Sequence, residues 1–282
     1  MRHNSSAFRL GTFLSGAALL LGGLLAALPL PAPAQIALTK HNLGTSPGGT
    51  GVNKFSGTAE ICVFCHTPHG ADTSAAVPLW NRTLPAPASF QTYDSLGTST
   101  LDGRTAPVGS VSIACLSCHD GVTAMSAVIN APGSGTAGSA AWQAGTWTGA
   151  NQTAGRISAG LITNIGSDLR NDHPVGIQYG GGGITDAAPT AATRDRDFKA
   201  PANAVIGTGR VWWVDTEATP NNSRQKSDMI LYTRAASSGY SGQTSPEPFV
   251  ECASCHDPHS SNATFLRISN AGSAVCLSCH VK

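Results

Sequence analysis

Every cysteine in this chain belongs to one repeated five-residue motif, C-x-x-C-H. The 282 residues contain 8 cysteines, and the four motifs span Cys62–His66, Cys115–His119, Cys252–His256 and Cys276–His280. This spacing is typical of c-type haem attachment, because two thiols three positions apart bind the vinyl groups of a porphyrin while the following histidine binds the iron. The sequence therefore predicts four covalently bound haem c groups. The attachment residues are Cys62, Cys65, Cys115, Cys118, Cys252, Cys255, Cys276 and Cys279, and the proximal ligands are His66, His119, His256 and His280.

Two other uses of these cysteines have to be weighed. Cys252, Cys255, Cys276 and Cys279 also match the spacing of a zinc ribbon, in which four thiolates close a tetrahedral site. An even number of cysteines in an exported chain is also compatible with a disulfide framework. Neither alternative explains why a histidine follows the second cysteine of every pair, so haem attachment is the favoured interpretation.

The N-terminus has the pattern of an export signal. Arg2 and Arg9 precede an uncharged run over residues 10–30, and Ala32 and Ala34 supply the small residues of a cleavage site. We expect a signal peptide over residues 1–34 and a single mature domain over residues 35–282, located outside the cell or in the periplasm. A retained anchor is the alternative, since the run is long enough to span a bilayer. After cleavage no membrane anchor is expected.

The composition predicts little regular structure. With 32 glycines, 6% aromatic and 12% charged residues, and roughly 60 residues for each haem, the porphyrins must supply much of the core. The expected fold is mostly irregular coil with short helices and a small β-hairpin, organised around four haems. The hairpin arms are residues 210–216 and 228–234, with a turn near 220–223. We expect Trp212 and Trp213 to pack against porphyrin rather than to relay electrons.

Four further histidines outside the leader match the four sixth ligands that the irons require: His41, His69, His173 and His259. His69 and His259 recur in the same context, C-H-x-P-H. A residue three positions after a proximal histidine cannot reach the opposite face of the same porphyrin, so each should ligate a neighbouring haem. His173 precedes the rigid Pro174, and His41 near the start of the mature chain could serve its own protomer or the next one.

These motifs resemble those of a known family. The four C-x-x-C-H motifs, the C-H-x-P-H extensions, the segment Lys40–Leu43 and the segment Asp172–Val175 are similar to the doubled C-x-x-C-H multihaem cytochromes c, and most of all to tetrahaem members that polymerise into extracellular conductive filaments. The resemblance implies bis-histidine iron, closely packed porphyrins and a histidine donated across the subunit boundary. His41 is the position expected to make that donation, giving a head-to-tail homopolymer.

Ligation and charge indicate the function. Iron held by two histidines has no vacant position for a substrate, so the chain is expected to transfer electrons at low potential rather than to act as an enzyme. The alternatives are a multihaem reductase of nitrite, hydroxylamine or a sulfur oxyanion, and a monomeric periplasmic carrier. The 17 basic and 16 acidic residues nearly balance, and haem propionates add negative charge, so nucleic acid is not an expected partner. The expected partners are redox proteins, extracellular electron acceptors and copies of the chain itself.

Overall fold

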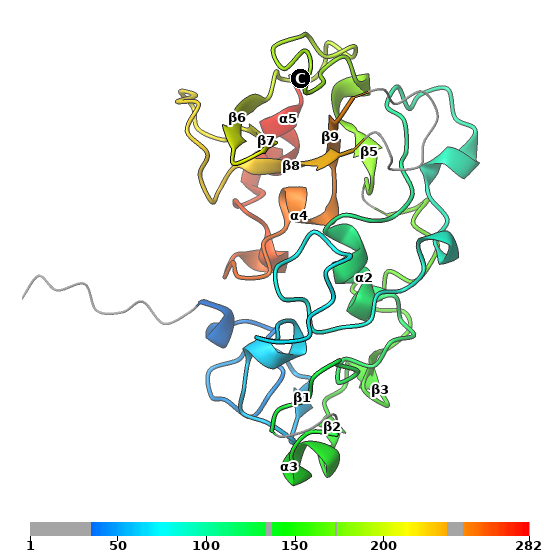
Figure 1. The fold of residues 1–282 in the computed structure, drawn as a ribbon, viewed down its shortest axis with the longest axis vertical. Coiled ribbons are helices and arrows are strands. Elements are labelled where there is room, and N and C mark those ends of the chain that lie inside the picture. Colours follow the sequence, from blue (N-terminus) through cyan, green and yellow to red (C-terminus); the bar gives the residue numbers. More distant parts are fainter. Residues whose placement is uncertain (1–34, 134–136, 173, 236–244, 282) are drawn as a thin grey trace, which may run out of the picture. The chain divides into compact units, whose positions relative to one another are not determined.

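The computed structural model describes residues 35–133, 137–172, 174–235 and 245–281, so the leader and His173 lie outside the described residues. Most of the described chain is coil and turn, as the composition predicts (Figure 1). Its α-helices are α2 (Ser112–His119), α3 (Ala140–Gln143), α4 (Cys252–Cys255) and α5 (Ala274–Cys279). Its 3-10 turns are η2 (Gln35–Leu38), η3 (Cys62–Phe64), η4 (Pro87–Ser89), η5 (Tyr93–Leu96), η6 (Tyr179–Gly181), η7 (Ala263–Phe265) and η8 (Ala271–Ser273).

The strands form one five-stranded antiparallel sheet and two small ribbons. The sheet has the order β5-β9-β8-β7-β6 and contains β5 (Ile177–Gln178), β6 (Ala202–Ile206), β7 (Gly209–Val214), β8 (Met229–Arg234) and β9 (Glu247–Val250). The ribbons pair β1 (Lys54–Phe55) with β2 (Trp147–Thr148), and β3 (Gln152–Thr153) with β4 (Arg156–Ile157).

The expected hairpin forms the centre of this sheet. β7 and β8 pair with Trp212 opposite Leu231 and Trp213 opposite Ile230. Strands β5, β6 and β9, which flank the two arms, are not predicted by the sequence pattern. Their local signals are weak because β5 has two residues, β6 is rich in small residues and β9 contains Pro248.

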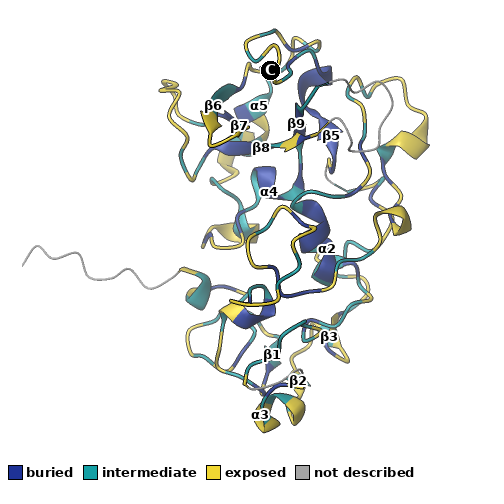
Figure 2. Cartoon of the chain, in the orientation of Figure 1, coloured by how far each residue is buried: buried dark blue, intermediate teal, exposed yellow. Residues whose placement is uncertain are grey.

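Many residues of α2, α4 and β9 are buried (Figure 2). One cluster contains Ile113, Ala114 and Leu116 of α2 and packs against Cys65 and Cys252. A second contains Trp212, Met229 and Leu231 of the sheet and packs against Cys255 and Cys279. Trp212 and Trp213 of β7 are almost completely buried, with 0% and 1% of their surface exposed. The apolar interior is therefore assembled around the attachment turns rather than away from them. No helix in the described ranges is long and apolar enough to cross a bilayer.

Candidate haem centres

Each cysteine motif forms one tight helical turn. The backbone N–H of His66 donates to the Cys62 carbonyl at 2.8 Å. His256 and His280 make the same bond to the first cysteine of their motifs, at 3.1 and 3.0 Å, and the second motif lies inside α2. This turn brings both thiols to one side of the helix with the histidine at its end, as thioether attachment requires. No disulfide joins any two of these cysteines in the described chain.

Three of the four turns are held by a short strand-like segment, here called a docking segment. The docking segments are residues 78–81, 264–267 and 196–199, and they contact the first, third and fourth motifs. In each case the proximal histidine forms an isolated antiparallel β-bridge with the docking segment. His66 pairs with Trp80, His256 with Leu266 and His280 with Phe198. The residue after each histidine also donates its N–H to the docking segment, at 2.9 Å to Leu79, 2.8 Å to Phe265 and 2.8 Å to Asp197.

The last residue of every docking segment makes the same two bonds. The backbone N–H groups of Asn81, Arg267 and Lys199 donate to the second cysteine carbonyl of their motifs at 2.9, 2.9 and 2.8 Å. Their side chains donate to the carbonyl that follows the first cysteine, at 2.6, 3.0 and 2.7 Å. Because carbonyls at the end of a helical turn lack backbone partners, these donors satisfy groups that would otherwise be unpaired.

Backbone carbonyl groups also orient the rings of three proximal histidines, through their Nδ1 atoms. The Nδ1 atoms of His66, His119 and His256 lie 2.8, 2.7 and 2.8 Å from the backbone carbonyls of Pro78, Thr163 and Thr264. A carbonyl only accepts hydrogen bonds, so Nδ1 carries the proton and the lone pair of Nε2 is left for a metal. This is the second-shell arrangement usual for histidines that ligate metals.

Backbone strain accompanies two of these contacts. Leu79 and Phe265 occupy the same place in their docking segments, and both adopt left-handed conformations with φ of 55° and 59°. Non-glycine residues are disfavoured there by about 1–2 kcal/mol. The strained residue follows the carbonyl that orients His66 in one segment and His256 in the other, which is the kind of functional position where such strain persists.

The four motifs are neighbours in the order first, second, third, fourth. The Cys115 and Cys252 thiols hydrogen-bond each other, which raises the pKa of Cys115 and lowers the pKa of Cys252. Burial raises the pKa of the Cys65 thiol to about 12, and nearby Cys118 adds to that rise. Burial likewise raises the pKa of Cys279 to about 12, with a contribution from Cys255. Successive motifs are thus close enough for their groups to interact.

Two further histidines lie opposite proximal ones. The ring centroids of His66 and His259 are 6.3 Å apart, and those of His119 and His41 are 6.4 Å apart. Each pair could therefore hold one iron between its two rings, because bonds of about 2 Å from each imidazole nitrogen to a metal would give a separation of about this size. Rotation about each metal–nitrogen bond permits any angle between the rings, so the interplanar angles of 14° and 68° are both compatible with this geometry.

His41 is held in a partly buried position. Its ring stacks on Phe265 with centroids 4.1 Å apart and an interplanar angle of 11°. Burial, with the charge of His119 in second place, lowers the pKa of His41 to about 4, although a hydrogen bond to the backbone of Pro258 opposes the shift. Burial also lowers the pKa of His119. Both rings are therefore neutral at pH 7, which is the form that binds metals.

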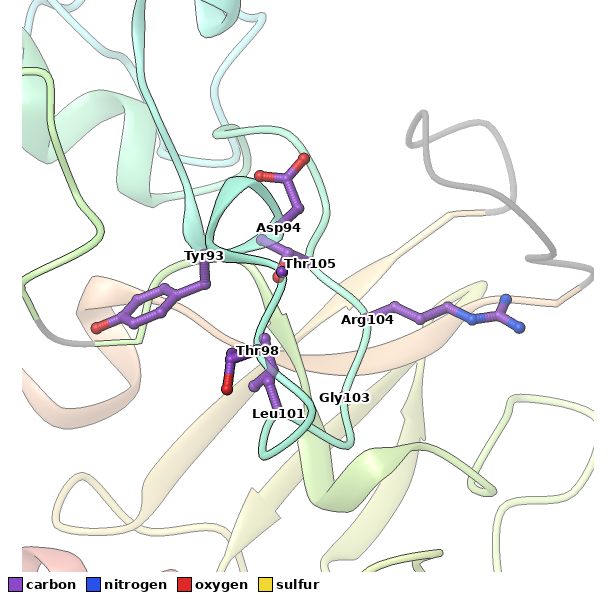
Figure 3. Close-up of a pocket in the computed structure, with 8 residues that line it drawn as sticks. Tyr93, Asp94, Thr98, Leu101, Gly103, Arg104 and Thr105 are labelled. Atoms are coloured by element: carbon purple, nitrogen blue, oxygen red, sulfur yellow. The ribbon is translucent and has the colours of Figure 1, made fainter.

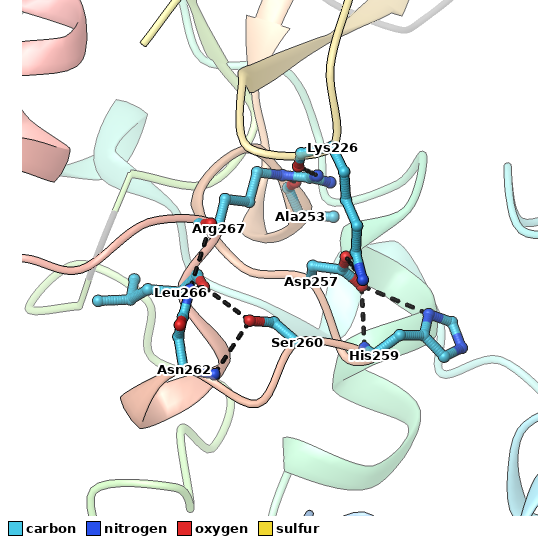
Figure 4. A network of polar contacts seen from close by, with 8 residues as sticks. All are labelled: Lys226, Ala253, Asp257, His259, Ser260, Asn262, Leu266 and Arg267. Carbon is cyan, nitrogen blue, oxygen red and sulfur yellow. Dashed lines mark hydrogen bonds and ion pairs between the residues drawn. The ribbon is translucent and has the colours of Figure 1, made fainter. Parts of the chain in front are cut away.

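His259 is oriented by its own loop (Figure 4). Asp257 accepts a hydrogen bond from the His259 backbone at 2.9 Å, and its Oδ1 lies 3.4 Å from His259 Nδ1. Lys226 and Arg267 approach the same loop, Lys226 with its ammonium 3.5 Å from Asp257 and Arg267 through the carbonyls of Ala253 and Lys226. The carboxylate behind Nδ1 again leaves Nε2 available.

The other two predicted sixth ligands differ from this pair. His69 is exposed, and within the described residues its ring makes no aromatic contact. Its backbone carbonyl accepts hydrogen bonds from Thr67 and Asn130 at 3.0 and 2.8 Å. His173 lies outside the described residues, although the hydroxyl of Tyr93 donates to the carbonyl of its neighbour Asp172.

Buried polar atoms without partners suit a porphyrin with its propionates. The indole Nε1 atoms of Trp80, Trp212 and Trp213 are buried, and within the described part of the chain they have no hydrogen-bond partner. Trp80 lies edge-on to His66 with ring centroids 6.0 Å apart, and Trp212 belongs to the cluster around Cys255 and Cys279. Orphaned donors of this kind call for an acceptor that a carboxylate of haem would supply. The residues present therefore fit the group.

One hollow in the described part of the chain lies away from these motifs. It has a volume of about 420 Å³ and is lined by residues of η5 and the following loop, including Tyr93, Asp94, Leu101 and Arg104 (Figure 3). None of the predicted attachment or ligand residues lines it.

Across the described residues, no three His, Cys, Asp or Glu side chains converge as a metal cluster, which is the arrangement that a zinc ribbon would need.

The comparison with known families supports haem attachment. Residues 247–282 match the family described as the doubled CXXCH motif. The match covers the third and fourth motifs, and such motifs indicate covalently bound haem c. It is consistent with a multihaem c-type cytochrome that takes part in electron transfer. No curated protein matches the chain.

The docking segments are the part of the site that sequence reasoning missed. Their shared signal is a bulky apolar residue followed by a side-chain donor: Trp80-Asn81, Leu266-Arg267 and Phe198-Lys199. Two of them follow their motif within about 15 residues, but Phe198 precedes His280 by about 80. A two-residue signal at such variable separation is not recognisable without the fold.

Proposed function

We propose that this chain is a tetrahaem c-type cytochrome that passes electrons along a row of four bis-histidine haems. The observation that carries the proposal is the pair of histidine couples, 66 with 259 and 119 with 41, each at the separation of two axial ligands on one iron. Bound haem would supply an iron that alternates between ferric and ferrous forms. The chain's own residues would hold each porphyrin, orient its ligands and exclude water.

The ligand assignments follow from these couples. His259 would complete the first haem and His41 the second, both within one chain. His69 and His173 then remain for the third and fourth haems. Because the thiols of successive motifs are neighbours, the four motifs would hold the haems one after another in the order of the sequence. Electron tunnelling falls steeply with distance, so such a row favours transfer from one end to the other.

The row also bears on enzymatic activity. If all eight axial positions are filled by histidine, no iron is open to a substrate and the protein is a carrier rather than an enzyme. A reductase of nitrite, hydroxylamine or a sulfur oxyanion would need one open iron. The fourth site is where this would occur, because within the described residues His280 faces Phe198, at 4.2 Å between ring centroids, and no second histidine.

We also propose export and head-to-tail polymerisation, with a revised donor. The resemblance pointed to His41 as the histidine given to the next copy, but His41 lies against His119 of its own chain. His69 is exposed and stands beside the first motif, at the opposite end of the row from the fourth. A histidine at one end that completes an iron at the other end of the next copy makes a heterologous contact, which generates an open polymer.

Intact-mass analysis of the exported protein tests the haem count. We expect a chain that begins near Gln35 and carries four haems, with a low-spin ferric spectrum. Fewer than four haems, or a bare polypeptide, would refute the proposal.

Negative-stain imaging tests the polymer. We expect filaments from the native chain and from His41→Ala, and only discrete particles from His69→Ala. Discrete particles from the native chain at every concentration would reject polymerisation, and filaments from His69→Ala would reject the revised donor. A high-spin component that binds carbon monoxide in the native protein would favour the reductase.

A further inference from the structure

Arg82 is a buried cation without a carboxylate partner among the described residues. It is 0% exposed, and it directly follows the docking segment of the first motif. Its guanidinium donates to the Ser117 carbonyl at 3.2 and 2.8 Å, to Ser117 Oγ at 3.2 Å, and to the carbonyls of Met125 and Ala124 at 2.8 Å each. All of these acceptors are neutral.

This charge lies beside the first and second cysteine motifs. Ser117 lies inside the second motif, near the C-terminal end of α2, where carbonyl groups favour a cation. Arg82 also directly follows Asn81, whose backbone N–H donates to the Cys65 carbonyl of the first motif at 2.9 Å. The guanidinium therefore stands between the first and second attachment turns.

A buried charge near a redox centre changes its potential. An iron porphyrin gains one positive charge when it is oxidised, and a fixed cation nearby disfavours that state. Burial removes the water that would screen the interaction, so its effect exceeds that of a surface charge at equal distance. Arginine keeps its charge at all accessible pH values, which makes it a permanent bias rather than a switch.

We propose that Arg82 is a potential-setting residue that raises the reduction potential of the second haem, and to a smaller extent of the first. The inference rests on the proposed function, since it needs haem at these motifs. It goes further by assigning a direction: without Arg82, electrons would be held less strongly at this end of the row.

Asp120 supplies an opposing charge at the same site. It follows His119, is almost fully buried, and accepts hydrogen bonds from the N–H groups of Val122 and Thr123 at 2.9 and 2.8 Å and from the Thr123 hydroxyl at 2.6 Å. No ion pair joins Asp120 to Arg82 in the described chain. The two charges thus act separately on the second haem, and removing either one has a predicted sign.

Spectroelectrochemical titration of the purified holoprotein tests the proposal. We expect Arg82→Met to lower the reduction equilibrium constant of the second haem at least tenfold, which is 59 mV for a one-electron couple. Arg82→Lys keeps the charge and should stay within a factor of three of the native value. Asp120→Asn should shift the same couple upward. Arg156→Met is the matched control, because Arg156 is exposed and follows Gly155, whose carbonyl accepts the Met125 N–H at 2.8 Å.

Haem content of each variant is measured first, by intact mass. A native chain with fewer than four haems refutes the proposed function, whereas a four-haem Arg82→Met protein with native potentials overturns only the role of Arg82. Equal shifts in Arg82→Met and Arg82→Lys would attribute the effect to packing and overturn it as well. If the Met variant does not fold, Arg82→Gln retains amide donors for the Ser117 carbonyl and carries the same expectation.

Discussion

Replacing His259 by alanine should open the first haem, although the residue belongs to the third motif in sequence. Its ring centroid lies 6.3 Å from that of His66, so an iron between them loses its sixth ligand when the imidazole is removed. The same bond would tie together positions about 190 residues apart, and a cross-link closing such a loop contributes up to about 5 kcal/mol. The variant should therefore show one high-spin haem and a free energy of unfolding lower by up to that amount.

The assay combines spectra with unfolding in urea. Carbon monoxide should bind one haem of the reduced His259→Ala protein and none in the native protein. A background lacking Cys62 and Cys65 identifies the haem, because there the substitution should add no further high-spin signal. In a background lacking Cys252 and Cys255 the signal should persist. His259→Met is the control for loss of packing, since methionine can still ligate iron and should raise the potential instead.

Either of two results would refute this reasoning. The first is a His259→Ala protein with four low-spin haems and native stability. The second is a high-spin signal that survives removal of the first haem and disappears with removal of the third, because His259 would then serve its own motif.

Three further predictions follow from the docking segments and from His41. Burial lowers the folded-state pKa of His41 to about 4, so between pH 6.5 and 4 the unfolded chain binds a proton that the folded chain does not. Stability in urea unfolding should therefore fall by about 3 kcal/mol as the pH drops through that range, and a stability that stays constant there would contradict the burial of a neutral His41. Leu79→Gly should stabilise the protein by about 1 kcal/mol in urea titration because glycine tolerates the φ of 55°, while Leu96→Gly, equally exposed but without a positive φ, should not. Asn81→Ala removes hydrogen bonds of 2.6, 2.9 and 2.8 Å to Val63 and Asn130 and should lower the stability in thermal unfolding by about 3 kcal/mol. An equal loss in the exposed Asn151→Ala would refute the role of Asn81 in holding the first motif.

The local elements of this fold can be predicted from the sequence, because each depends on residues that are close together in the chain. The C-x-x-C-H turn needs only five residues, and the β7–β8 pairing of Trp212 with Leu231 needs two apolar arms and a turn between them. Both are visible as short patterns. The docking segments are not, because strands β6 to β9 separate Phe198 and Lys199 from the fourth motif in the sequence.

The axial couples depend on still longer contacts. Counting histidines gives four proximal and four candidate sixth ligands, but no local pattern says that His259 faces His66 or that His41 faces His119. No sequence pattern distinguishes Arg82 from the other basic residues, of which the chain has 17 in all. Only the fold shows that it is 0% exposed and that it bonds to the second motif.

A density map of the purified haem-loaded protein, at a resolution that separates the imidazole rings, is the most direct test of the central claim. We expect four porphyrins in the order of the motifs, with iron between His66 and His259 and between His119 and His41 of the same chain. An iron at the first or second motif with any other sixth ligand, or a motif without porphyrin, would contradict it.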